Sequence, residues 1–207
     1  MAGVMRTMTA AMGNVPVTRR AAHFVGGRLG RVGAGLARAQ STVTTRFGDL
    51  DYWESVYSGQ KPSSQPFEWF LPFDTGLREH VLAFMPSPGR VLHLGCGTSD
   101  LGPRLAAEPN VKVHDIDASP SAVRIMAQRH QNVPRYTVST ADVLHLPFRA
   151  GSFNAALDKG TLDAILCKGS DSAQIAIKEV NRVLAPGGVF LQVSSEPPET
   201  RMDLLNA

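Results

Sequence analysis

The chain has 207 residues, of which 43% are hydrophobic, so it is long enough to form one domain with a substantial core. Its net charge of +3 comes from the first 48 residues, which hold seven arginines and no acidic residue, whereas the other 159 residues hold 14 basic and 18 acidic residues. This distribution of charge argues against nucleic-acid binding by the domain. Two cysteines are too few for a disulfide framework, and no Cys/His spacing is typical of a zinc site. No apolar run reaches the ~20 residues of a membrane span.

Residues 1–45 have the composition of a mitochondrial transit peptide. They are rich in Arg, Ala, Gly, Ser and Thr and contain no acidic residue. We expect this segment to be disordered and to direct the protein to the mitochondrial matrix. A plain disordered tail and an arginine-rich arm that binds nucleic acid are the alternatives that the composition leaves open.

Residues 46–88 are predicted to form a helical lid rich in aromatic side chains. Eight of the fourteen aromatic residues of the chain lie between residues 49 and 85. Such a density before the first strand is typical of a cover over a planar ligand. The alternative is a helix that packs its aromatic rings on a sheet.

Residues 89–207 are predicted to form the sheet core. Short apolar runs predict strands at residues 91–94, 111–116, 136–139, 153–157 and 189–193. Helices are predicted at residues 99–107, 120–130 and 173–184, the second with Ser119 as its N-cap. Strands separated by helices predict an α/β fold with a doubly wound, mainly parallel sheet.

A glycine-rich turn follows the first predicted strand. Gly95 and Gly97 allow a tight turn and a close approach of the backbone to a ligand. Asp117 lies twenty residues after Gly97, at the end of the next strand, where an acid binds the ribose of an adenosine-type nucleoside. The dinucleotide fingerprint needs a third glycine where this chain has Asp100, so a nicotinamide or flavin site is disfavoured.

The run Leu94-Gly-Cys-Gly-Thr-Ser99 resembles the S-adenosylmethionine-binding motif of class I methyltransferases. Asp142 after the third strand and Pro186-Gly-Gly188 before the fifth follow in the order that these enzymes have. A narrower resemblance, to protein-lysine methyltransferases that act on translation elongation factor or on mitochondrial citrate synthase, rests on three runs: Leu157-Asp-Lys-Gly-Thr-Leu-Asp-Ala164, Tyr52-Trp-Glu-Ser-Val-Tyr57 and Pro66-Phe-Glu-Trp-Phe70. The resemblance implies a Rossmann-like fold with S-adenosyl-L-methionine as cofactor.

The resemblance also implies roles for single residues. Gly95 would admit the methionine end of the cofactor, Asp117 would accept hydrogen bonds from the ribose hydroxyls, and Ala118 would lie against the adenine. Asp142 and the backbone amide of Val143 would face the adenine amino group. The other expected cofactor contacts are Trp53, Tyr57, Trp69 and Lys159, with a surface pair between Asp158 and Lys159 as the alternative for the lysine. No metal ligand is expected.

Asp158 and Asp163 are the candidate catalytic residues. Both are expected at the mouth of the site, where a carboxylate would orient an incoming lysine ammonium and take part in its loss of a proton. Asp115, two residues before the ribose-binding acid, is expected to be exposed at the tip of its strand because burial of a carboxylate is costly.

Citrate synthase in the mitochondrial matrix is the expected substrate, because the composition of residues 1–45 and the ending Val-Ser-Ser-Glu-Pro-Pro-Glu favour that enzyme. The alternatives are a methyltransferase for another protein such as an elongation factor, a small-molecule methyltransferase, and a cofactor-binding protein without activity. Only fourteen residues follow Val193, too few for both the helix and the antiparallel hairpin that usually complete such a sheet. We therefore expect the C-terminal hairpin to be missing or shortened and one edge of the sheet to be exposed.

Overall fold

The computed structural model describes residues 7–9, 46–194, 196 and 198–205. The predicted transit peptide, residues 1–45, lies outside the described residues except for a short strand that the sequence did not predict, β1 (Thr7–Thr9). No helix in the described ranges is long and apolar enough to cross a membrane.

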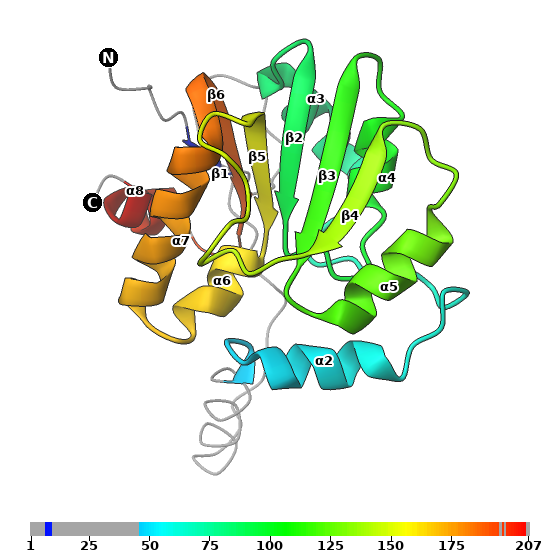
Figure 1. Cartoon of the computed structure of the whole chain (residues 1–207). Coiled ribbons are helices and arrows are strands. Elements are labelled where there is room, and N and C mark those ends of the chain that lie inside the picture. The colour runs from blue at the N-terminus through cyan, green and yellow to red at the C-terminus, as the bar shows by residue number, and fades with distance from the viewer. Residues whose placement is uncertain (1–6, 10–45, 195, 197, 206–207) are drawn as a thin grey trace.

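One parallel sheet organises the described part of the chain (Figure 1). Its order is β1-β6-β5-β2-β3-β4, and every neighbouring pair is parallel. The five predicted strands are all present as β2 (Gly89–Leu94), β3 (Val111–Asp117), β4 (Tyr136–Thr140), β5 (Phe153–Lys159) and β6 (Leu184–Val193). Strand order reverses at β2, and the crevice at the carboxyl ends of the strands beside such a switch point is where ligands bind in this class of sheet.

Helices cover both faces of the sheet, so the predicted doubly wound architecture is confirmed. On one face α6 (Thr161–Leu166) and α7 (Ser170–Val183) enclose a core that contains Leu92. On the other face η1 (Phe73–Leu77), α3 (Arg78–Phe84) and α4 (Leu101–Ala106) enclose a core that contains Val91. Val91 and Leu92 enter different cores because successive side chains of a strand point to opposite faces.

Helix α2 (Leu50–Ser58) lies across the end of the sheet where the strands terminate (Figure 1). Its buried Tyr57 packs against Ala122 and Ile125 of α5 (Pro120–Arg129), which follows β3. The aromatic N-terminal segment therefore closes the same edge of the sheet at which the glycine turn ends β2.

Among the element boundaries that differ from the prediction, the starts of α4 and β6 have a visible structural cause. Helix α4 begins at Leu101 rather than at residue 99, because Ser99 Oγ and the amide of Asp100 bind Glu68 instead of entering the helix. Strand β6 begins directly after α7 and contains the stretch expected to separate them. Gly187 adopts a φ of 76° there, and the register against β5 shifts between Phe153 and Ala155.

Helix α8 (Pro198–Leu205) follows β6, and its Leu205 packs into the core beside α7. No antiparallel strand is present in the described ranges. The expectation of an exposed edge is wrong over three residues of β6, because Phe190, Leu191 and Gln192 pair with β1.

Candidate active site

A pocket of about 1030 Å³ runs across the carboxyl ends of the strands. Residues that follow β2, β3, β4 and β5 line its floor, and side chains from α2 and residues 67–70 cover it. In the order of the strands it extends from Asp142, beyond β4, past Asp117 and Gly95, to Lys159 at the end of β5 and Glu196 beyond β6.

The two glycines of the turn are needed for contacts within the protein as well as for ligand approach. Gly95 and Gly97 have φ values of 54° and 51°, which strain any residue with a Cβ. A Cβ on Gly95 would overlap the hydroxyl of Thr161, which donates to the carbonyl of Leu94 at 2.8 Å. A Cβ on Gly97 would lie 2.5 Å from the hydroxyl oxygen of Tyr57. The turn is therefore held from both sides, by α6 and by α2.

Asp117 lies in the pocket with its carboxylate fixed by two backbone amides. Oδ2 accepts the N–H of Gly97 at 2.7 Å and Oδ1 accepts the N–H of Ser119 at 2.8 Å. Burial raises the pKa of Asp117, and these two hydrogen bonds oppose that rise. Each oxygen still has a lone pair for a further donor, which suits the two hydroxyls of a ribose.

The predicted adenine contacts lie at the same end of the pocket. Ala118 and Val143 line it beside Asp142. Oδ1 of Asp142 accepts the N–H of Leu144 at 2.9 Å, which fixes the direction of this exposed carboxylate. The structure thus brings the predicted adenosine-binding residues together at the ends of β3 and β4.

The aromatic residues predicted to cover the ligand also lie together on the pocket. Trp53 stacks on Tyr57 with ring centroids 6.1 Å apart and meets Trp69 edge-on at 6.1 Å. The indole N–H of Trp53 donates to the carbonyl of Phe47 at 2.7 Å, so Phe47 joins the same cluster. Burial raises the pKa of Tyr57, which keeps its phenol neutral.

Two glutamates that the sequence analysis did not single out anchor this cover. The carboxylate of Glu54 on α2 accepts hydrogen bonds from the hydroxyls of Ser119 and Ser121 at the first turn of α5. These bonds lower the pKa of Glu54. Glu68 accepts the hydroxyl of Ser99 at 2.7 Å and the amide of Asp100 at 2.8 Å. Both glutamates lie next to a tryptophan in the aromatic runs Tyr52–Tyr57 and Pro66–Phe70, and this position is the feature of the sequence that could have identified them.

Lys159 lines the pocket but is bound by the covering segment. Its ammonium pairs with Glu68 at 2.5 Å and donates to the carbonyls of Trp69 at 3.1 Å and Leu71 at 3.4 Å. The side chain is buried, with 5% of its surface exposed. The alternative of a surface pair with Asp158 is therefore wrong, because Lys159 is buried and binds a segment 88–91 residues earlier in the chain.

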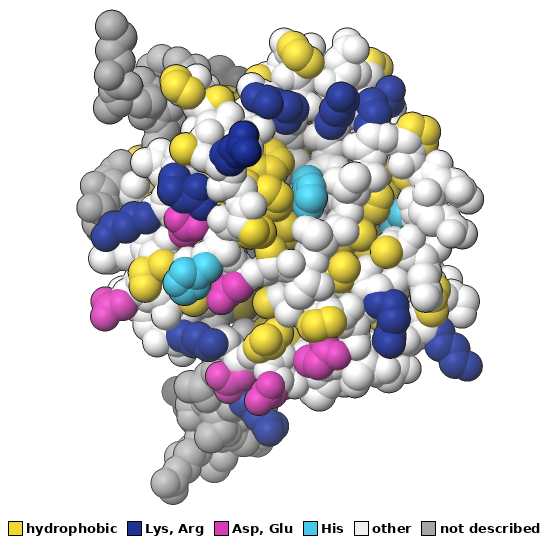
Figure 2. Space-filling view, viewed as in Figure 1, with side chains coloured by type: hydrophobic (Ala, Val, Ile, Leu, Met, Phe, Trp, Pro, Cys, Tyr) yellow, Lys and Arg dark blue, Asp and Glu magenta, His cyan; other side chains and the backbone are white. Residues whose placement is uncertain are grey.

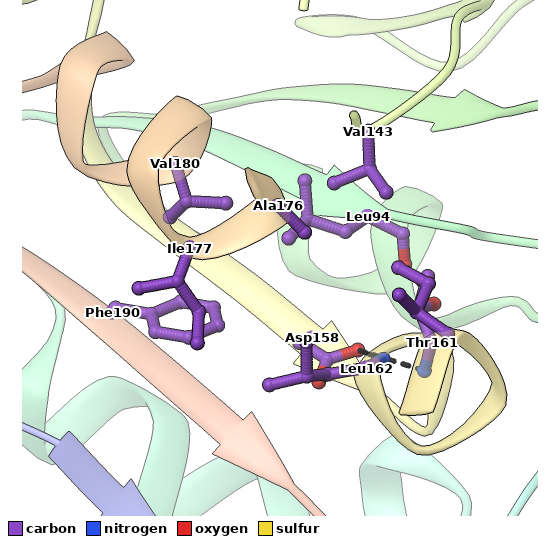
Figure 3. Close-up of a pocket in the computed structure, with 10 residues that line it drawn as sticks. Leu94, Val143, Asp158, Thr161, Leu162, Ala176, Ile177, Val180 and Phe190 are labelled. Atoms are coloured by element: carbon purple, nitrogen blue, oxygen red, sulfur yellow. Dashed lines mark hydrogen bonds between the residues drawn. The ribbon is translucent and has the colours of Figure 1, made fainter. Parts of the chain in front are cut away.

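Asp158 is not at the mouth of the pocket, and this part of the prediction is wrong. Its side chain is fully buried and accepts the N–H groups of Thr161 at 2.8 Å and Leu162 at 3.2 Å (Figure 3). It borders a cavity of about 10 Å³ whose other walls are mostly apolar. Burial, with a smaller contribution from repulsion by Asp163, raises the pKa of Asp158 to about 7. The carboxyl therefore binds N–H groups in the first turn of α6, which have no partner within the helix.

Asp163, the other candidate, does line the pocket. Its Oδ1 accepts the hydroxyl of Ser194 at 2.7 Å and pairs with the guanidinium of Arg201 at 2.5 Å. Arg201 comes from α8, so the C-terminal helix supports this wall of the site. Glu196 lines the pocket nearby and is exposed.

Asp115 is fully buried, contrary to the expectation that it would be exposed. Its carboxylate contacts Nδ1 of His93 at 3.1 Å and accepts the hydroxyl of Tyr136 at 2.9 Å. A Cβ on Gly102 would overlap it, so that glycine makes room for the carboxylate. These polar partners offset the free-energy cost of burying the carboxylate, which was the reason for expecting it to be exposed.

The surface near the pocket carries charges of both signs. Asp49 and Asp51 are exposed at the start of α2, and Lys168, which lines the pocket, is exposed just after α6. Figure 2 shows acidic side chains together with some Lys and Arg side chains at this end of the molecule, and a group of Lys and Arg side chains at the opposite end, where the strands begin. The described residues contain no group of His, Cys, Asp and Glu side chains that could hold a metal ion.

Comparison with known proteins agrees with this geometry. A methyltransferase domain family matches residues 91–188. Human mitochondrial citrate synthase-lysine N-methyltransferase is 32% identical over 188 residues, which cover 81% of this chain and 78% of that protein. The chain belongs to the class I S-adenosylmethionine-dependent methyltransferases. Its cofactor is S-adenosyl-L-methionine, and the fixed carboxylate of Asp117 beside the glycine turn fits a ribose at that place.

Other relatives of this methyltransferase differ in the protein named as their substrate. Mouse EEF1A lysine methyltransferase 4 is 34% identical over 167 residues, which cover 76% of this chain, and the chain spans 65% of that relative's length. The CcbJ methyltransferase of Streptomyces caelestis has the same fold, with a TM-score of 0.53 and 22% identity over 72% of this chain and 57% of its own.

Proposed function

We propose that this methyltransferase transfers methyl groups to lysine side chains of a protein. The observation that carries the proposal is the extent of the pocket, which continues past Gly95 to Asp163 and Glu196. The nucleoside-binding residues occupy one end, so the end beside α6 is available for a methyl acceptor. The names of the human and mouse relatives support lysine as that acceptor, and the exposed carboxylate of Glu196 at this end of the pocket suits a cationic side chain.

The cofactor-binding role of the predicted residues is part of this proposal. Asp117 accepts the ribose hydroxyls, Ala118 packs on the adenine, and Asp142 with the amide of Val143 binds the adenine amino group. Gly95 lies at the methionine end, between the adenosine-binding residues and α6. The cover over the cofactor consists of Trp53, Tyr57 and Trp69.

When bound, S-adenosylmethionine supplies a methyl group already activated by its positively charged sulfur. The protein must then orient the acceptor, exclude water and favour the neutral form of the lysine amine. Asp163 is the carboxylate that we assign to orient the incoming ammonium before it loses its proton. Asp158 holds the first turn of α6, which begins at Thr161. It thereby positions Asp163, the third residue of that helix.

Citrate synthase is the substrate that we propose, with action in the mitochondrial matrix. The human relative that covers most of this chain carries that substrate in its name, and residues 1–45 have a transit-peptide composition. Elongation factor 1A is the second candidate, because the mouse relative named for that substrate has a similar sequence identity to this chain.

The test is a methylation assay with purified proteins. The full chain is incubated with isotope-labelled S-adenosylmethionine and either citrate synthase or elongation factor 1A, and mass spectrometry locates the label. We expect the label on a lysine of citrate synthase, and Asp117→Ala as the cofactor-binding control should abolish it. Label on elongation factor alone would contradict the substrate, and cofactor binding with no labelled protein would contradict the activity.

The location is tested separately by import. Residues 1–45 fused to a fluorescent protein should enter mitochondria. The same fusion with its arginines replaced by glutamine should stay outside, because import of such segments depends on their positive charge. A fusion that remains in the cytosol would contradict the matrix location and leave the methylation result unaffected.

A further inference from the structure

Phe70 has an unusual backbone conformation at the edge of the pocket. Its φ is 62°, one of three positive values among non-glycine residues in the described part of the chain. The N–H of Leu71 donates to the carbonyl of Trp69 at 2.8 Å, which closes a γ-turn centred on Phe70. A γ-turn with positive φ at its centre is the rare and strained form, and an aromatic residue there persists only where its surroundings impose it.

Lys159 is the group that imposes this turn. Its ammonium donates to the carbonyls on both sides of Phe70, at 3.1 Å to Trp69 and 3.4 Å to Leu71, and pairs with Glu68. Glu68 is in turn held by Ser99 and Asp100, the two residues immediately before α4. All three N–H bonds of a buried lysine are thus directed to residues 68–71.

The turn places the ring of Phe70 over the end of β5. A Cβ on Gly160 would lie 3.2 Å from Cε2 of Phe70, so the ring rests on this glycine. The next residue, Thr161, contacts Gly95. Because β5 and β3 lie on opposite sides of β2, the ring is on the far side of the glycine turn from Asp117.

The ring is also too exposed to be explained by core packing. Phe70 lines the pocket and 41% of its surface is exposed. A strained backbone and a buried lysine therefore hold an exposed aromatic side chain at the end of the pocket that is not used for the nucleoside. Strain of this kind is concentrated at functional sites.

We propose that Phe70 forms the aromatic wall of the methyl-acceptor site and that Lys159 is the positioning residue that holds it there. This inference rests on the proposed lysine methyltransferase activity. The ring offers an apolar surface to the aliphatic part of the acceptor lysine and a π face to its ammonium. It also excludes water from around the amine, so that the lysine, once it has lost its proton, meets the methyl group without a hydration shell.

The first test compares Phe70→Ala with Phe84→Ala, whose phenylalanine is equally exposed at 40% but lies on α3 and does not line the pocket. For Phe70→Ala we expect kcat/KM toward the acceptor protein to fall by about tenfold, in line with the loss of a desolvated cation–π contact. The dissociation constant of the cofactor, measured by calorimetry, should stay within about threefold. Phe84→Ala should change neither quantity. Equal activity of the two variants would overturn the role of Phe70.

The second test asks whether Lys159 acts through Phe70. Lys159→Met should raise the KM of the acceptor and leave cofactor affinity close to that of the wild type. In the Phe70→Ala background the same change should have no further effect on that KM, because the positioned ring is already gone. Additive losses in the double variant would overturn the positioning role. A wild-type chain that methylates no protein would instead overturn the proposed function, and with it this inference.

Discussion

The buried carboxyl of Asp158 provides a quantitative prediction of stability against pH. Burial raises its pKa from 3.8 to about 7, so the native state holds a proton that the unfolded chain has already released between these values. The free energy of unfolding therefore falls as the pH rises from about 4 to about 7 and changes little above that. A pKa difference of this size corresponds to about 4 kcal/mol at full ionisation.

Asp158→Asn removes this titration and keeps the shape of the side chain. The amide oxygen still accepts the N–H groups of Thr161 and Leu162, which are the bonds made by the carboxyl. The variant should match the form of the wild type in which Asp158 is protonated in both the native and the unfolded state, so we expect it to be more stable than the wild type by about 2 kcal/mol at pH 5 and by about 4 kcal/mol at pH 8. The hydrogen bonds from the amides of Thr161 and Leu162 favour the ionised carboxylate and lower the pKa of Asp158, but burial outweighs them.

The assay is urea-induced unfolding of both proteins at pH 5, 6, 7 and 8. The difference between the two curves isolates Asp158, because all other titrating groups are shared. Asp171→Asn, which replaces an exposed aspartate in the first turn of α7, is the matched control for the chemical change itself. A constant difference for Asp158→Asn, or a variant that is less stable at pH 8 than at pH 5 relative to the wild type, would refute the reasoning.

Three further predictions concern the cofactor end of the site and its support. Asp117→Ala should raise the dissociation constant of S-adenosylmethionine about 100-fold in calorimetry, because two charge-assisted hydrogen bonds are lost, whereas Asp142→Ala should cost about tenfold. Gly97→Ala should weaken cofactor binding, because Ala is strained at a φ of 51° and its Cβ would meet Tyr57. Tyr57→Phe in the same chain should restore part of the affinity for the cofactor. If no affinity is restored, the clash with the hydroxyl of Tyr57 is unimportant. Tyr136→Phe removes a donor from the buried Asp115 and should lower the free energy of unfolding by about 1–3 kcal/mol in thermal melts, and an unchanged melting temperature would contradict this account.

The elements of the sheet were predictable because their signals are local. Strands that are buried on both faces are read as short apolar runs, and all five predicted strands are present. The glycine turn and Asp117 were found by spacing, and the structure places them together at the end of β2 and β3. The start of α4 was misplaced because Glu68, some thirty residues earlier, binds the two residues that would have begun the helix.

The sequence by itself determined the parallel α/β sheet, the family to which the chain belongs and the residues proposed to bind the nucleoside. Only the tertiary structure decided what the buried charges do: Asp115 is compensated by His93 and Tyr136, Asp158 holds α6, and Lys159 holds the turn at Phe70. The physical reason is that the cost of burying a charge depends on partners that arrive from distant segments. Lys159 and Glu68 are 91 residues apart, so no local pattern could reveal that they pair beside the turn at Phe70.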